Sequence, residues 1–124
     1  MTNQMSAIKR QIGLCIVLTG LLHSIVGLVL FAEDLIPIVT DGLWDTVVGE
    51  TRLLNRENAF WFMMFGFVLM LLGYAVDWML KKLGAAPPAA LGWLLLATCL
   101  LGAVIMPVSG FWLGLPQAWI LARR

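Results

Sequence analysis

Charged side chains are scarce in this sequence of 124 residues. Lysine, arginine, aspartate and glutamate together make up 12%, against 61% hydrophobic residues, and the formal net charge is +1. A soluble domain of this size needs a polar surface that such a composition cannot supply. The sequence also lacks the basic cluster that a nucleic-acid partner would require. Composition therefore predicts one integral membrane domain, with membrane lipid and not nucleic acid around it.

Residues that commonly carry catalysis or bind metals are equally few. His23 is the only histidine, and the two cysteines, Cys15 and Cys99, fall inside apolar segments. We interpret the cysteines as small apolar core residues and not as a disulfide. A lone histidine without cysteine or carboxylate partners at ligand spacing indicates no metal site. No phosphate-binding loop, redox pair or nucleophile with a base at defined spacing is present, so we expect no metal and no cofactor.

Long apolar runs dominate what remains. A helix that crosses the hydrocarbon core of a membrane needs about 20 mostly apolar residues. The last apolar stretch is too long for one such helix, and the turn sequence Pro107-Val108-Ser109-Gly110 divides it into a hairpin. The sequence therefore predicts an all-α, four-helix integral membrane bundle, with helices over residues 11–31, 58–77, 89–106 and 111–122.

Positive charges would gather on one side of this bundle. The connection over residues 32–57 is mostly acidic, whereas the Lys/Arg pairs fall at the other ends of the helices. Because positively charged ends stay inside, the pairs belong in the cytoplasm and the acidic connection outside. We expect a multi-pass protein of the cytoplasmic membrane with both termini in the cytoplasm. The pairs are Lys9 and Arg10, Lys81 and Lys82, and Arg123 and Arg124.

The external connection is expected to contain a short amphipathic helix. Asp41 is suitably placed to cap its N-terminus. The helix would lie on the membrane surface or cover the outer mouth of the bundle. Its apolar face would hold Trp44, Val47 and Val48, and its polar face Asp45 and Glu50.

His23 lies near the middle of the first predicted span. An imidazole at that depth is costly unless it faces a partner inside the bundle. It is either a neutral histidine bonded to a neighbouring helix or part of a functional site, which would bind a ligand, handle a proton or, as the least favoured alternative, ligate a metal or haem. Gly13, Gly20 and Gly27 recur every seven residues beside it. Small residues in such a stripe let another helix approach closely.

A second polar cluster stands at the outer start of the second predicted span. Asn55 is expected to cap the helix, and Glu57 in its first turn suits the helix dipole. Arg56 is unfavourable there unless it is paired. It either pairs with an acid of the external connection or binds an anionic head group, and Asn58 would point into the bundle. In the hairpin, a broken helix at Pro116 beside Gln117 indicates either a cavity wall or plain helix packing.

Three blocks of the sequence resemble an uncharacterised family of small four-helix bacterial membrane proteins, a domain-of-unknown-function family. The resemblance spans nearly the whole chain and implies a four-helix bundle in a bacterial cytoplasmic membrane. It implies no activity, substrate or cofactor. The blocks are Gly20-Leu21-Leu22-His23 with Gly27, Arg56-Glu57-Asn58-Ala59-Phe60-Trp61-Phe62, and Met106-Pro107-Val108-Ser109-Gly110-Phe111-Trp112 with Leu115-Pro116-Gln117-Ala118-Trp119.

The rare polar groups project from predicted outer or central positions of the bundle, which favours a protein that binds or transports a lipophilic small molecule in an outward-facing pocket. Alanine at His23 and Arg56 should then weaken binding. One alternative is an assembly protein that docks a larger membrane partner or a second copy through the glycine stripe. Another is a membrane enzyme that uses His23 or Glu57 as acid or base on a lipid. The expected pocket lining is His23, Arg56, Glu57, Asn58, Trp61, Trp112 and Gln117.

Overall fold

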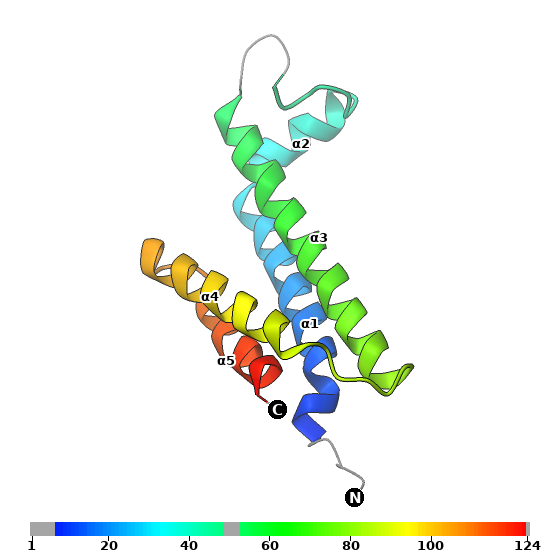
Figure 1. Ribbon diagram of the computed structural model, residues 1–124. Helices are drawn as coiled ribbons and strands as arrows, with labels where there is room; N and C mark the ends of the chain where they lie inside the picture. The colour runs from blue at the N-terminus through cyan, green and yellow to red at the C-terminus, as the bar shows by residue number, and fades with distance from the viewer. Residues whose placement is uncertain (1–6, 49–52, 124) are drawn as a thin grey trace, which may run out of the picture.

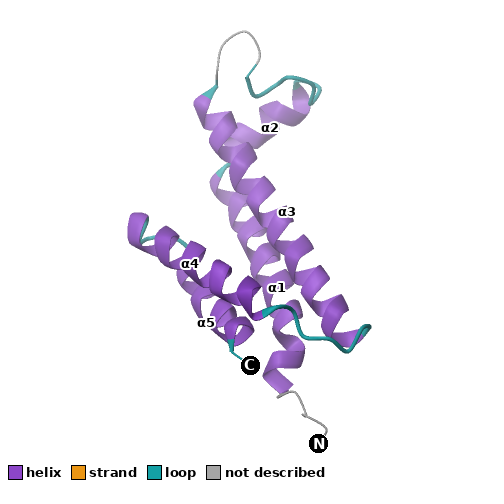
Figure 2. Ribbon diagram, viewed as in Figure 1, coloured by secondary structure: helices purple, strands orange, loops and turns teal. Residues whose placement is uncertain are grey.

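The computed structural model of the chain describes residues 7–48 and 53–123, which form helices joined by short loops (Figures 1 and 2). No strand occurs in these two ranges, so the predicted all-α class is confirmed. The last helix covers residues 111–122, as predicted. In chain order the helices are α1 (Ala7–Leu30), α2 (Ala32–Thr40), α3 (Leu54–Lys81), α4 (Ala89–Ile105) and α5 (Phe111–Ala122).

Two of these helices are long and apolar enough to cross a membrane. α1 has 24 residues and α3 has 28, so they are about 36 and 42 Å long at 1.5 Å per residue. Both exceed the hydrocarbon thickness of about 30 Å. α4 and α5 are apolar but shorter, with 17 and 12 residues. At about 25 and 18 Å, neither reaches that thickness.

Glycines bring the backbones of α1 and α3 into contact. A Cβ added to Gly20 would lie 2.9 Å from the carbonyl oxygen of Gly66, and one added to Gly73 would lie 2.5 Å from the amide nitrogen of Val17. Gly13 lies against the backbone of Asp77, whereas Gly27 lies against the side chains of Phe62 and Met63. The glycine stripe is therefore buried inside the chain. α3 of the same chain covers this stripe, whereas the sequence led us to expect a larger partner or a second copy against it.

α4 and α5 form a second closely packed helix pair, in which glycines again allow the close approach. Gly92 lies against the backbone of Ala122, and Gly102 lies against the ring of Phe111. A Cβ on Gly114 would meet the sulfur of Cys99 at 2.5 Å. Close packing of small residues supplies the van der Waals contact that holds helices together when both faces are equally apolar.

The two pairs join at the end of the molecule that carries the termini, here called the basal end. The buried cluster there consists of residues from α1, α3 and α5, and Leu91 and Leu95 of α4 pack against it. The Nζ atom of Lys9 donates a hydrogen bond of 2.8 Å to the carbonyl oxygen of Arg123. The buried residues of the cluster are Ile12, Ile16, Val76, Leu80 and Leu121.

Away from the basal end the two pairs diverge (Figure 1). α5 packs against α1, but no backbone of α4 or α5 closely approaches α3 within the described ranges. The molecule therefore consists of two helix pairs that pack closely mainly through α1 and α5, and the predicted four-helix bundle is not confirmed. The end of the α1–α3 pair beside α2 is called the distal end below.

The helix of the connection lies earlier in the chain than predicted. α2 ends at Thr40, so Asp41 follows the helix instead of capping its start, and residues 41–48 form turns. Gly42, with φ of +98°, ends the helix. Its amide donates to the carbonyl of Val39 at 3.2 Å, and the amide of Leu43 donates to that of Ile38 at 3.1 Å. This is the glycine-terminated helix end known as the Schellman motif. The predicted position of Glu50 lies outside the described residues.

Candidate functional site

An open hollow of about 310 Å³ lies at the distal end, between the turns that follow α2 and the first turns of α3. Its volume is at the lower limit of pockets that bind small molecules. Only Glu57 and Trp61 of the predicted lining are among its walls. The walls are Leu43, Asp45, Thr46, Val47 and Val48 from the turns, and Glu57, Phe60 and Trp61 from α3.

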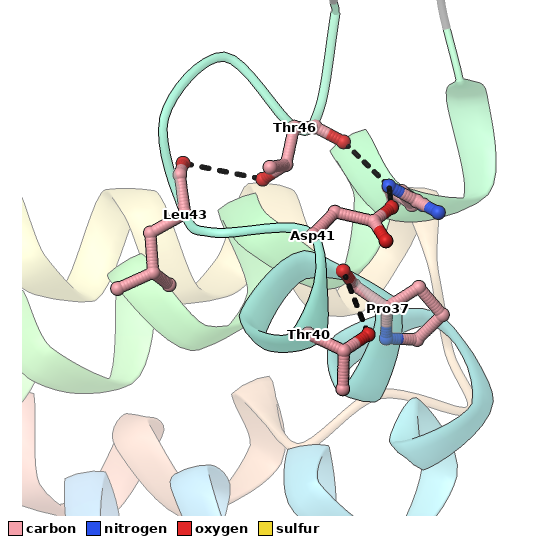
Figure 3. A network of polar contacts seen from close by, with 6 residues as sticks. Pro37, Thr40, Asp41, Leu43 and Thr46 are labelled. Atoms are coloured by element: carbon pink, nitrogen blue, oxygen red, sulfur yellow. Dashed lines mark hydrogen bonds and ion pairs between the residues drawn. The ribbon is translucent and has the colours of Figure 1, made fainter.

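Arg56 holds the turns that form one wall of the hollow. Figure 3 shows the two residues of these turns that it bonds, Asp41 and Thr46. Its Nη1 atom donates to Asp41 Oδ2 at 2.9 Å and to the carbonyl oxygen of Thr46 at 2.8 Å. The two acceptors lie on either side of the turn, so one guanidinium closes it. Of the two interpretations of Arg56, the pair with an acid of the connection is the one that the structure shows.

The turn that Arg56 closes has a strained backbone. Leu43 has a φ of 70° and Asp45 a φ of 49°. Left-handed conformations of this kind cost residues other than glycine about 1–2 kcal/mol each. A chain without a clamp would relax them. The ion pair and the hydrogen bond to Thr46 therefore maintain the shape of the hollow.

Alanine in place of Arg56 is expected to loosen the turns without unfolding the helices. The variant loses two charge-assisted hydrogen bonds, worth about 1–2 kcal/mol together at this partly exposed position. Amide hydrogen exchange of residues 41–48, followed by mass spectrometry, should become about tenfold faster. The matched control is Lys82→Ala, which removes an exposed cation from the basal end. Equal exchange of these turns in Arg56→Ala and in the parent would contradict the clamp.

His23 is bonded to the neighbouring helix. Its Nε2 atom lies 2.9 Å from the carbonyl oxygen of Phe62, and because a carbonyl only accepts, Nε2 carries the proton. The ring stacks on Phe62 with centroids 3.9 Å apart and meets the edge of Phe65 at 5.2 Å. These contacts match the first of the two interpretations of His23. The walls of the hollow do not include it.

The remaining predicted site residues do not gather at the hollow. Gln117 Nε2 donates to Thr19 Oγ1 at 2.6 Å and so connects α5 to α1. Trp112 Nε1 donates to the carbonyl oxygen of Pro107 at 2.8 Å and closes the hairpin turn. Asn58 is exposed, so the expectation that it points into the bundle was wrong.

Asn55 does not cap α3. The helix begins at Leu54, and Leu53 in the cap position makes no side-chain hydrogen bond to the helix. Asn55 therefore lies inside the first turn. The sequence predicts that Leu53 and Leu54 belong to the connection, although leucine is a good helix former and α3 begins at Leu54.

Most walls of the hollow were missed by sequence reasoning. Leu43, Thr46 and Phe60 belong to it, and none of them was singled out as a candidate. One signal was available, because the sequence Thr40-Asp41-Gly42 is typical of a helix end. A helix that ends there makes the following residues a turn that can fold back on α3.

The walls of the hollow suit an amphipathic molecule. Five of them are apolar, namely Leu43, Val47, Val48, Phe60 and Trp61, and they offer burial to an apolar body. Three polar side chains stand beside them, Asp45, Thr46 and Glu57, and the Thr46 hydroxyl donates to the carbonyl oxygen of Leu43 at 3.2 Å. Within residues 7–48 and 53–123, no three His, Cys, Asp or Glu side chains are close enough to hold a metal ion.

Comparison with known proteins identifies a family without assigning an activity. No curated protein and no solved structure matches the chain. One family model does match, and it covers residues 7–124, which include all the helices described above. Its description is "Family of unknown function (DUF6463)", in agreement with the resemblance to a domain-of-unknown-function family. The chain belongs to this family of unknown function, DUF6463.

Proposed function

We propose that this protein is a multi-pass protein of the cytoplasmic membrane that binds a lipophilic small molecule in the distal hollow. The observation that carries the proposal is the hollow itself, an open space of about 310 Å³ with mainly apolar walls and three polar side chains. Pockets of this composition bind small molecules through apolar burial and orient them through a few hydrogen bonds.

The surface of the helices supports insertion in a membrane. Large apolar side chains are exposed along α1, α3 and α4, including Val29 at 73%, Leu71 at 67% and Val104 at 75%. Contiguous apolar surface of this extent is rare on soluble proteins, and lipid is its natural solvent. α1 and α3 would cross the membrane, with the α4–α5 hairpin beside them.

The charge distribution supports one orientation. Lys9, Lys81, Lys82 and Arg123 lie at the helix ends of the basal end, whereas Glu33 and Asp34 lie in α2 at the distal end. The positive-inside rule then places the basal end and both termini in the cytoplasm. The distal hollow opens to the outer side.

Trp61 offers the largest apolar wall of the hollow and is the residue to substitute. Alanine at this position is expected to reduce the lipophilic molecule retained per chain about tenfold, which corresponds to about 1.4 kcal/mol of lost contact. The measurement is native mass spectrometry of protein purified from membranes in a mild detergent. The matched control is Trp93→Ala, because Trp93 is also a half-exposed tryptophan but lies on α4 outside the hollow. Equal retention in both variants, or a parent protein without any bound molecule, would contradict the proposal.

A further inference from the structure

The tip of the α4–α5 hairpin lies level with the middle of the α1–α3 pair. Gln117 of α5 is bonded to Thr19, and Phe111 at the start of α5 meets the ring of Phe65 with centroids 6.0 Å apart. Phe65 in turn contacts His23. α1 continues beyond His23 over residues 24–30, about another 10 Å at 1.5 Å per residue.

Some of the polar groups of the hairpin turn are paired within the turn itself. The amide of Ser109 donates to the carbonyl of Met106 at 3.0 Å, and the Ser109 hydroxyl accepts from the amide of Phe111 at 3.4 Å. The indole of Trp112 donates to the carbonyl of Pro107. Each such bond lowers the cost of placing the turn in a hydrocarbon layer, where no water replaces a missing partner.

Most side chains around this turn are apolar and exposed, and Ser109 is the polar exception. Val108 at its apex is 91% exposed. No charged residue occurs between Lys82 and Arg123. A connection at a membrane–water interface normally carries polar or charged side chains. The exposed residues of the tip are Val104, Ile105, Met106, Val108, Trp112 and Leu113.

We propose that α4–α5 is a re-entrant hairpin that enters the membrane from the basal side, turns inside the hydrocarbon near the depth of His23 and returns. The lipid acyl chains of the opposite leaflet would then cover the face of α1 and α3 beyond the tip. This inference rests on the membrane orientation of the proposed function. It changes the topology from four crossings to two crossings and a hairpin.

The face beyond the tip has the chemistry of an acyl-chain surface. Val26 and Leu30 follow Thr19 by 7 and 11 residues, which places them on the same side of α1 as the contact with α5. Trp61 precedes Phe65 by one turn on α3. All three residues are exposed. Asn58, a further turn away, is exposed at the polar edge of this face.

Lipid fits this face better than another protein helix does. Helices associate in membranes through small residues and interhelical hydrogen bonds. The glycines of α1 and α3 already lie in the contact between these two helices. The face beyond the tip instead presents the bulky apolar side chains of Val26, Leu30 and Trp61. Flexible acyl chains adapt to such an uneven surface, and the indole of Trp61 suits the boundary with the head groups.

Cysteine accessibility tests the depth of the turn. The parent would carry Cys15→Ala and Cys99→Ala, and Val108→Cys would place a single thiol at the apex. Two further single-cysteine variants serve as controls, Trp44→Cys for the distal turns and Leu83→Cys for the loop after α3, and both positions are exposed. Each is treated with a membrane-impermeant maleimide, in intact cells and again after the membrane is permeabilised.

We expect the Val108→Cys thiol to react at least tenfold more slowly than both controls under both conditions, because a thiol in hydrocarbon neither ionises nor meets the reagent. Trp44→Cys should react in intact cells, and Leu83→Cys only after permeabilisation. Reaction of Val108→Cys in intact cells would show that the hairpin crosses the membrane, which overturns the inference and leaves the proposed function standing. A Trp44→Cys thiol that reacts only after permeabilisation would instead show that the distal end faces the cytoplasm. That result would overturn the proposed membrane orientation and, with it, the re-entrant hairpin.

Discussion

Alanine at Gly73 is expected to destabilise the protein by about 2–3 kcal/mol, since inserted atoms in a tightly packed interface force backbone shifts. The new Cβ would lie 2.5 Å from the amide nitrogen of Val17 and 2.8 Å from the carbonyl oxygen of Gly13. Both are backbone atoms, which cannot move aside as a flexible side chain can. The two helices must separate, and the loss spreads along the interface. The free energy of unfolding would be measured by titration with a denaturing detergent, followed by circular dichroism.

The matched control for this variant is Gly110→Ala. A Cβ on Gly110 meets nothing within 4 Å, and its φ of −75° is ordinary for any residue. Its free energy of unfolding should stay within about 0.5 kcal/mol of the parent value. Alanine is a better helix former than glycine by up to about 1 kcal/mol. A Gly73→Ala variant as stable as the parent, or more stable, would therefore mean that α1 and α3 are not in backbone contact.

Alanine at His23 is expected to cost about 2 kcal/mol of stability. The variant loses the hydrogen bond to the Phe62 carbonyl, worth about 0.6–1 kcal/mol in a membrane protein, and the stacked ring pair, worth about 0.5–1.5 kcal/mol. The same detergent titration measures the loss. Because His23 is not a wall of the hollow, retention of the lipophilic molecule should remain at the parent level. This differs from the expectation from sequence that His23 itself binds the ligand.

Phenylalanine at His23 separates the two contributions. The ring and its stacking on Phe62 remain, whereas the hydrogen bond is lost, so the cost should fall to about 1 kcal/mol or less. A His23→Ala variant that keeps full stability but loses the bound molecule would reverse the assignment. His23 would then be a ligand contact and not a helix-packing residue.

Local sequence signals predicted the helices well and their association less well. The bounds of α5 follow from the turn at Pro107 and Gly110 and from the arginines that end the apolar run. The role of His23 was one of two stated alternatives, because a polar group among apolar residues requires a partner. The glycine stripe was recognised, but its target was not. Periodicity shows that small residues share one face of a helix, but it does not show which other helix covers that face.

The hollow could not be predicted from sequence patterns, and the reason is physical. Its shape depends on left-handed φ values at Leu43 and Asp45, which are rare for these residue types. Those values persist because Arg56, 15 residues after Asp41, clamps the turn. The contact of Gln117 with Thr19 joins residues 98 positions apart. Neither Gln117 nor Thr19 belongs to a sequence motif from which the other could be predicted.

The most direct test of the central claim is to identify the molecule that occupies the hollow in the membrane. A photoreactive benzoylphenylalanine in place of Phe60, a wall of the hollow, would be illuminated in intact membranes and its adducts identified by mass spectrometry. The same residue in place of Leu71, which is exposed on α3 outside the hollow, reports the bulk lipid. We expect one dominant lipophilic species at position 60 and the general lipid mixture at position 71. The same mixture at both positions would contradict a specific binding site.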